Sequence, residues 1–151
     1  MSKIPVKVTY GVMAAVDLAL HYGSLPVQAK VIAQRQAIPA RFIEQVLQSL
    51  KQAGVVDSLR GAQGGYSLRN PPDETTLADI VGAMNGHQDS SLRPLPTNGH
   101  GDRPHHQEKI LTTIWDRVRQ AERDILSSIT LQTLVDQYSL LEQERAPMYH
   151  I

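Results

Sequence analysis

The feature that most constrains the fold is a change of hydrophobic period within the first half of the chain. Before Gly54, apolar residues recur at three- and four-residue steps in three segments bounded by Gly or Pro. This spacing predicts amphipathic helices over about 9–22, 27–35 and 40–53. After Gly54 the pattern changes to two short strands, 55–59 and 66–68, separated by a glycine-rich turn. The first half therefore reads as three helices followed by a β-hairpin.

The third predicted helix has one apolar face and one polar face. The apolar stripe consists of Phe42, Ile43, Val46, Leu47 and Leu50, and the opposite face of Arg41, Glu44, Gln45, Gln48 and Lys51. A short turn, 36–39, joins this helix to the one before it. Helix, helix, tight turn, helix and hairpin is the order of a winged helix-turn-helix, in which such a polar face enters the DNA major groove. We therefore expect a mainly α fold with a small β-hairpin.

The hairpin turn reads R-G-A-Q-G-G-Y-S-L from Arg60 to Leu68. Its glycines allow positive φ and remove side-chain bulk, so the backbone can approach a nucleic acid. Arg60 adds a positive charge, which narrow minor grooves attract. A phosphate-binding loop is disfavoured because no Gly-Lys-Ser/Thr follows and the next element is a strand. The simpler alternative is a hairpin with flexible turn residues.

Charge and composition limit the function. Net charge is zero, but residues 1–72 carry eight Lys and Arg against three Asp and Glu (+5), and residues 73–151 carry seven against twelve (−5). The basic half is expected to face an anion. There is no cysteine, which excludes disulfides, thiolate metal sites and a Cys nucleophile. The apolar stretch 12–20 is too short to cross a bilayer and contains Asp17, so we expect a cytoplasmic protein without a membrane partner.

The second half continues with a helix over 77–84, which Thr75 or Thr76 can cap. Residues 85–106 lack periodicity and are rich in Gly and Pro, which predicts a long loop. A long helix follows over 107–128, and Thr130 can cap a last helix ending near 141. The expected organisation is a DNA-binding domain at 1–84, an effector or sensor-type loop at 85–106, dimerisation and terminal helices at 107–141, and an irregular tail at 142–151.

The long helix carries a broad apolar stripe. We expect it to form a dimer interface, with candidate residues Ile110, Ile114, Trp115, Val118, Ala121 and Ile125. A helix of about twenty residues is near 30 Å long, more than a small domain can cover. The alternative is that the stripe packs on the winged helix of its own chain.

Several segments together resemble the Rrf-two family of winged-helix transcription regulators, the IscR, NsrR and CymR type. They are I-A-x-R-Q-x-I, F-I-E-Q-V-L, L-K-Q-A-G-V-V, R-G-A-Q-G-G-Y-S-L and P-P-D-E-T-T-L-A-D-I-V, followed by I-W-D-R-V and S-I-T-L-Q-T-L-V. The resemblance implies a homodimer with an N-terminal winged helix, a long dimerisation helix and a palindromic operator on double-stranded DNA.

The resemblance also implies which residues contact DNA. The candidates are Pro39, Ala40, Arg41, Glu44, Gln45, Gln48, Arg60, Gly61, Gly64 and Gly65. Gln45 can pair with adenine, Arg41 can reach guanine or phosphate, and Glu44 can accept a hydrogen bond from cytosine. Arg60 matches the wing arginine of the family. Pro39 and Ala40 stand where hydroxyl residues are commoner, and the alternative for Glu44 and Gln45 is a solvated helix face.

This sequence departs from the family at its sensor. Cluster-binding members place three cysteines in the loop before the long helix, and some place a histidine where Thr112 stands here. Without cysteine a conventional iron–sulfur cluster is not expected, and we predict no cofactor. His100, His105 and His106 are the remaining candidate metal ligands, but their spacing matches no zinc pattern, so a polar loop is the preferred interpretation. Such a loop is also a candidate site for a partner protein or small-molecule effector.

The sequence contains no catalytic constellation, so we predict a regulator and no enzyme. Two alternatives stay open. One is a winged-helix module for protein contacts, and the other is a His-based metal sensor that regulates transcription.

Overall fold

The structure is a computed structural model that describes residues 4–86 and 106–145. In chain order its elements are α1 (Val6–Leu20), α2 (Ala29–Gln36), α3 (Ala40–Gln52), β1 (Val56–Leu59), β2 (Gly65–Leu68), a 3-10 turn η1 (Pro72–Glu74), α4 (Leu77–Asn85), α5 (His106–Ser128) and α6 (Leu131–Arg145). The mainly helical fold with one two-stranded hairpin confirms the predicted fold class.

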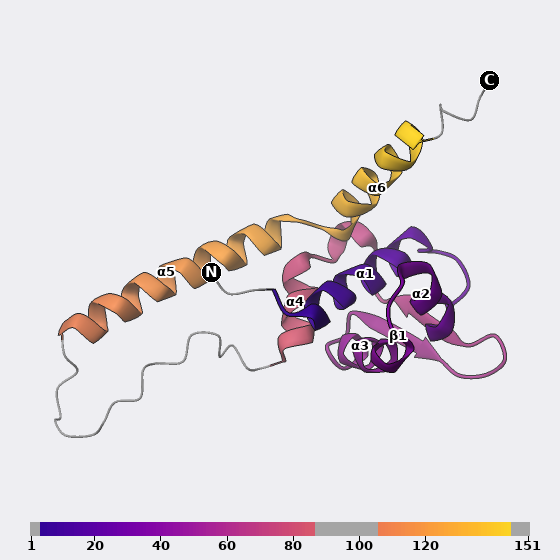
Figure 1. Ribbon diagram of the computed structural model, residues 1–151, viewed down its shortest axis with the longest axis horizontal. Helices are drawn as coiled ribbons and strands as arrows, with labels where there is room; N and C mark the ends of the chain where they lie inside the picture. Colours follow the sequence, from indigo (N-terminus) through magenta and orange to yellow (C-terminus); the bar gives the residue numbers. More distant parts are fainter. Residues whose placement is uncertain (1–3, 87–105, 146–151) are drawn as a thin grey trace.

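Helices α1, α3 and α4 surround the main core (Figure 1). Leu18, Leu47 and Ile80 are buried at its centre, one from each helix. Gly11 permits the close approach of α4 to α1, because a Cβ at this position would lie 2.6 Å from Cγ of Met84. The hydrophobic periodicity of α1 does not predict this requirement, because it contains no information on which helix packs against Gly11. Taken alone, a glycine inside a helix only argues against the helix.

The hairpin pairs β1 and β2 antiparallel, from Val56 opposite Leu68 to Leu59 opposite Gly65. Val27 pairs with Tyr66 of β2 through an isolated β-bridge. The Val27 amide donates to the Tyr66 carbonyl at 2.9 Å, and the Tyr66 amide donates to the Val27 carbonyl at 2.7 Å. This bridge corrects the predicted second helix, which begins at Ala29 and not at 27.

Other element ends follow ordinary capping chemistry. Gly54 ends α3 with φ of +79°, as predicted for a left-handed cap. Thr76 forms a capping box with Asp79 at the start of α4. Thr130 accepts a hydrogen bond from the Thr133 amide at the start of α6. Helix α1 begins three residues earlier than predicted and ends at Leu20.

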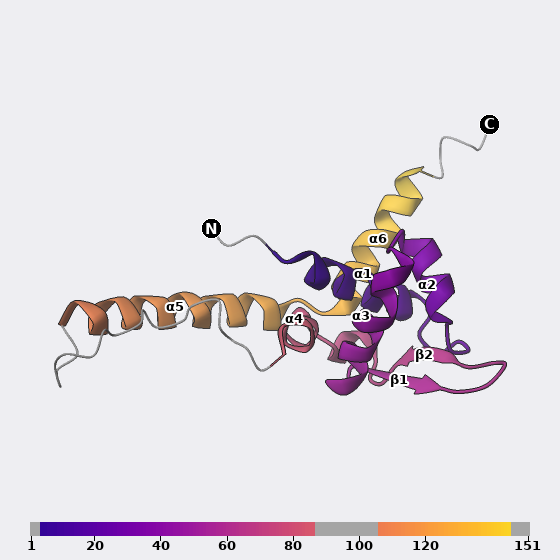
Figure 2. The ribbon, with the colours of Figure 1, turned by 60° about the horizontal axis from the view of Figure 1, so that its bottom comes forward.

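Helix α5 extends away from the rest of the chain on the side opposite the hairpin turn (Figures 1 and 2). The link to α6 returns to the domain, where Leu77 donates to the Ile129 carbonyl and Leu131 donates to the Thr75 carbonyl. Leu131 is fully buried, so it fixes the start of α6 in the N-terminal core. Helix α6 continues to Arg145, which corrects the expectation of an irregular tail from 142. No helix in the described ranges is long and apolar enough to span a bilayer.

Candidate DNA-binding surface

The outer face of α3 is polar, and no other part of the described chain covers it. Ala40, Arg41, Glu44, Gln45 and Gln48 are exposed, while the apolar residues Ile43, Val46, Leu47 and Leu50 on the other face are buried. Pro39 is the half-buried N-cap residue and contributes no side-chain cap. The predicted recognition residues of this helix therefore share one accessible face, with Pro39 at its edge.

The α2–α3 turn is held tight by backbone geometry. Ala37 ends α2 in the left-handed region, at φ of +54°, and its neighbour Ile38 is buried. A non-glycine residue in this region carries a strain of roughly 1 kcal/mol. No turn residue in the sequence marks this conformation, so sequence reasoning missed it.

A buried carboxylate fastens α2 to α1. Asp17 is 1% exposed. It accepts hydrogen bonds from Arg35 at 2.8 Å and from Gln36 at 3.0 Å. Nδ1 of His21 lies 2.7 Å from the Asp17 carbonyl, and Nε2 lies 3.2 Å from Arg35. Asp17, which interrupts the apolar stretch of α1, therefore has a structural role, and Arg35 is its ion-pair partner.

Arg41 has a defined position on the surface. Its guanidinium carbon lies 4.7 Å from the centre of the Phe42 ring, a cation–π contact. Phe42 in turn contacts Tyr10 of α1, with ring centres 5.8 Å apart. The stack orients Arg41 while it leaves the side chain exposed.

The β1–β2 hairpin corresponds to the wing of a winged helix, and its turn, residues 60–64, presents Arg60 to solvent. Among the described residues no hydrogen bond or ion pair to Arg60 is found. Gly61 has φ of +113° with open space around it. It is the glycine whose conformation permits close approach to a backbone outside the chain.

Gly64 and Gly65 have a different reason to be glycine. A Cβ on Gly64 would lie 2.2 Å from the Leu59 carbonyl oxygen, and one on Gly65 would lie 2.5 Å from the Val27 backbone. Gly64 is also buried. The hairpin itself therefore requires glycine at both positions, and their contact with DNA stays a prediction.

The base of the wing carries a second Arg–Asp pair. Arg69 donates to Oδ1 of Asp57 through Nε at 3.0 Å and a terminal nitrogen at 2.8 Å. This hydrogen bond raises the pKa of Arg69, and the negative charge of Asp57 raises it further. Burial raises the pKa of Tyr66 on β2, and the carboxylate of Glu44 on α3 raises it further.

The predicted interface residues of α5 are exposed. Ile110 is 60% exposed, Trp115 45% and Ile125 61%, and Ile114, Val118 and Ala121 are exposed as well. The alternative that this stripe packs on its own domain is therefore wrong for the described conformation. Exposed apolar stripes of this length are typical of association surfaces.

A helix with a free polar face, a tight preceding turn and an arginine-tipped hairpin define the winged helix-turn-helix class of DNA-binding proteins. Comparison with known proteins gives the family. The model of the Rrf2 family, described as an iron-dependent transcriptional regulator, matches residues 4–137. The chain belongs to the Rrf2 family of transcriptional regulators.

The similarity to known proteins extends over nearly the whole chain. CymR of Bacillus subtilis is 35% identical over 99% of both chains. IscR of Vibrio campbellii is 31% identical over 93% of this chain and 81% of its own. Among solved structures, T. potens IscR superposes with a TM-score of 0.75 at 32% identity, covering 99% of this chain and 97% of its own. B. subtilis CymR has a TM-score of 0.69 at 33% identity, covering 91% and 98%. These relatives are transcriptional regulators and not enzymes, which agrees with the sequence prediction.

The family description names iron, but the donor set of this chain does not fit a conventional iron–sulfur cluster. The sequence has no cysteine, and thiolates are the standard ligands. Thr112, at the position of the family histidine, donates its hydroxyl to the Glu108 carbonyl at 2.8 Å within α5. His100, His105 and the 87–105 part of the predicted loop lie outside the described residues. His106 is the exposed first residue of α5, and the described ranges contain no group of three potential metal ligands.

Proposed function

We propose that the chain acts as a homodimer that binds a palindromic promoter site through two copies of α3 and the wing. The single observation that carries this proposal is the coexistence of two unpartnered surfaces. One is the polar face of α3 together with the exposed Arg60 at the hairpin turn, and the other is the exposed apolar stripe of α5.

The two surfaces lie on different parts of the molecule (Figure 2). Pairing of two α5 helices would bury both stripes and leave each α3 facing outward. Dimers of this class place their recognition helices about 34 Å, or one helical turn of DNA, apart, so the two-fold axis of the dimer requires a palindromic site. Within each half-site, Arg41 and Gln45 would contact base edges, Glu44 would select against mismatched bases, and Arg60 would enter the minor groove.

Charge on this surface supports contacts to phosphate. Arg35 and Arg69 are paired inside the domain, but the structure gives no ion pair to Arg41, Lys51 or Arg60 within the described ranges. These three cations lie on α3 or at the wing turn. We therefore expect a steep loss of affinity as salt is added, because bound cations release condensed counterions from DNA.

Genome-wide capture of bound DNA in the source organism identifies the sites, and fluorescence anisotropy on a recovered site then tests the surface. We expect Arg60→Ala to weaken binding by about 1–3 kcal/mol. The matched control is Arg145→Ala, which removes the same charge at the exposed end of α6. Equal effects of the two variants would refute the wing contact, and salt-independent or absent DNA binding would favour the protein-interaction alternative.

A further inference from the structure

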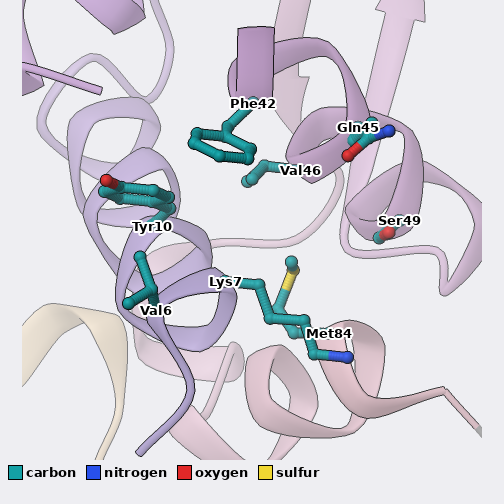
Figure 3. Close-up of a pocket in the computed structure, with 8 residues that line it drawn as sticks. All are labelled: Val6, Lys7, Tyr10, Phe42, Gln45, Val46, Ser49 and Met84. Carbon is teal, nitrogen blue, oxygen red and sulfur yellow. The ribbon is translucent and has the colours of Figure 1, made fainter. Parts of the chain in front are cut away.

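A pocket of about 240 Å³ lies directly behind the recognition helix (Figure 3). It is formed where the start of α1, the middle of α3 and the end of α4 meet. Its lining residues are Val6, Lys7, Tyr10, Phe42, Gln45, Val46, Ser49 and Met84. All of them lie in well-formed helices, so the pocket belongs to the folded domain.

The walls of the pocket are apolar and aromatic. Tyr10 and Phe42 contribute two rings, and Val46 and Met84 are buried. Met84 packs against Gly11, and its thioether is a favourable partner for an aromatic ring. A cavity of roughly 150 Å³ is large enough for benzene. The present pocket therefore has room for one ring with a short polar substituent.

The rim of the pocket defines the substituent. Lys7 is the charged residue of the lining set, and no anionic partner for it is found in the described ranges. Gln45 and Ser49 add an amide and a hydroxyl on the α3 side (Figure 3). Apolar walls with a few convergent polar groups are typical of small-ligand sites. We propose that this pocket is a regulatory site for a small aromatic carboxylate, with the ring between Tyr10, Phe42 and Met84 and the carboxylate on Lys7.

The position of the pocket couples it to the DNA-binding surface, and this part of the inference rests on the proposed function. Phe42 forms a wall of the pocket, and Arg41 stacks on its ring at 4.7 Å. Gln45 lies at the rim and is also a candidate for base contact. A ligand that shifts the Phe42 ring would move Arg41, and a ligand that binds the Gln45 amide would compete with its base contact. Ligand binding is therefore expected to weaken DNA binding by roughly tenfold, and DNA to weaken ligand binding by the same factor.

Ligand binding can be tested without DNA. Methyl NMR of the full-length protein is recorded during titration with phenylacetate, with phenylacetamide as the uncharged control. We expect saturable shifts confined to Val46, Met84 and their neighbours. Lys7→Gln should weaken phenylacetate binding about tenfold, and Lys109→Gln, an exposed lysine on α5, should not. Absence of saturable shifts up to about 10 mM, or equal binding of the amide, would overturn the site.

A second measurement tests regulation. Anisotropy on a captured DNA site is repeated over a titration of phenylacetate, and the apparent affinity of the wild type should fall roughly tenfold at saturation. In Lys7→Gln the same fall should need about tenfold more phenylacetate. An unchanged affinity in the wild type would overturn the regulatory role. A protein that bound phenylacetate but no DNA would refute the proposed function and leave the pocket as a ligand site.

Discussion

The two Arg–Asp ion pairs of the domain provide a test of how burial governs stability. The pairs Arg35–Asp17 and Arg69–Asp57 both have a closest N···O distance of 2.8 Å. The Asp17 side chain is 2% exposed, whereas the Asp57 side chain is 52% exposed. The same substitution, Asp to Asn, can therefore be made in two pairs that differ in solvent access.

The structure gives the expected cost of Asp17→Asn. The two carboxylate oxygens accept from different donors, one from Arg35 and the other from Gln36. An amide has one oxygen, so its NH₂ group would face one of these donors at hydrogen-bond distance. Breaking a buried pair costs about 3–5 kcal/mol. Because the Arg35 side chain is 37% exposed and regains water, we expect a loss of about 2–3 kcal/mol in the free energy of unfolding.

Asp57→Asn should leave stability unchanged within error, because water replaces the lost contact on both exposed partners. Urea unfolding followed by circular dichroism measures both variants. The protein concentration is held fixed, since dissociation of a dimer would make the midpoint depend on it. Equal shifts of the two urea midpoints, or an unchanged midpoint for Asp17→Asn, would contradict this reasoning. They would show that burial of the carboxylate does not set how much the ion pair contributes to stability.

Three further outcomes are expected. Gly65→Ala should destabilise the protein by about 2–4 kcal/mol, because the added Cβ would meet the Val27 backbone and residue 65 has a φ of +153°. Gly82→Ala lies in open space within α4 and should instead stabilise the protein by about 0.5–1 kcal/mol. Similar urea midpoints for the two variants would refute this contrast. Glu44→Ala should change the preferred base in a binding-site selection more than the total affinity, and a uniform loss across sequences would exclude discrimination by Glu44. Val118→Glu should weaken dimerisation by at least about 100-fold in sedimentation equilibrium, while Gln120→Glu, on the opposite face by helical spacing, should have no effect.

Much of this architecture could be predicted because it follows from local patterns. The stripe of α3, the cap at Gly54 and the exposed apolar face of α5 are each set by neighbours in sequence. The exposed polar face of α3 could be predicted as soon as the buried face was known, because residues opposite Ile43 and Leu47 must face outward.

The remaining features depend on contacts between distant segments. Val27 pairs with Tyr66 across the domain, so the helical pattern around Val27 gave the wrong start for α2. The role of Asp17 depends on donors from α2, and that of Gly65 on the approach of the Val27 backbone. No periodicity marks such contacts. They explain why the hairpin requires glycine at positions 64 and 65, whose contact with DNA stays a prediction.

The pocket behind α3 illustrates the same limit. Its walls come from three helices, and each lining residue fits the pattern of its own helix. Only the meeting of α1, α3 and α4 brings Lys7 of α1 into one pocket with Phe42 of α3 and Met84 of α4. A site of this kind has no sequence signature.

Hydroxyl-radical footprinting of the wild-type protein on a captured DNA site tests the central proposal most directly. A dimer with paired α3 helices should protect two patches of equal strength, related by two-fold symmetry and about one helical turn apart. A single protected patch, or two patches without symmetry, would contradict the proposed dimer on DNA.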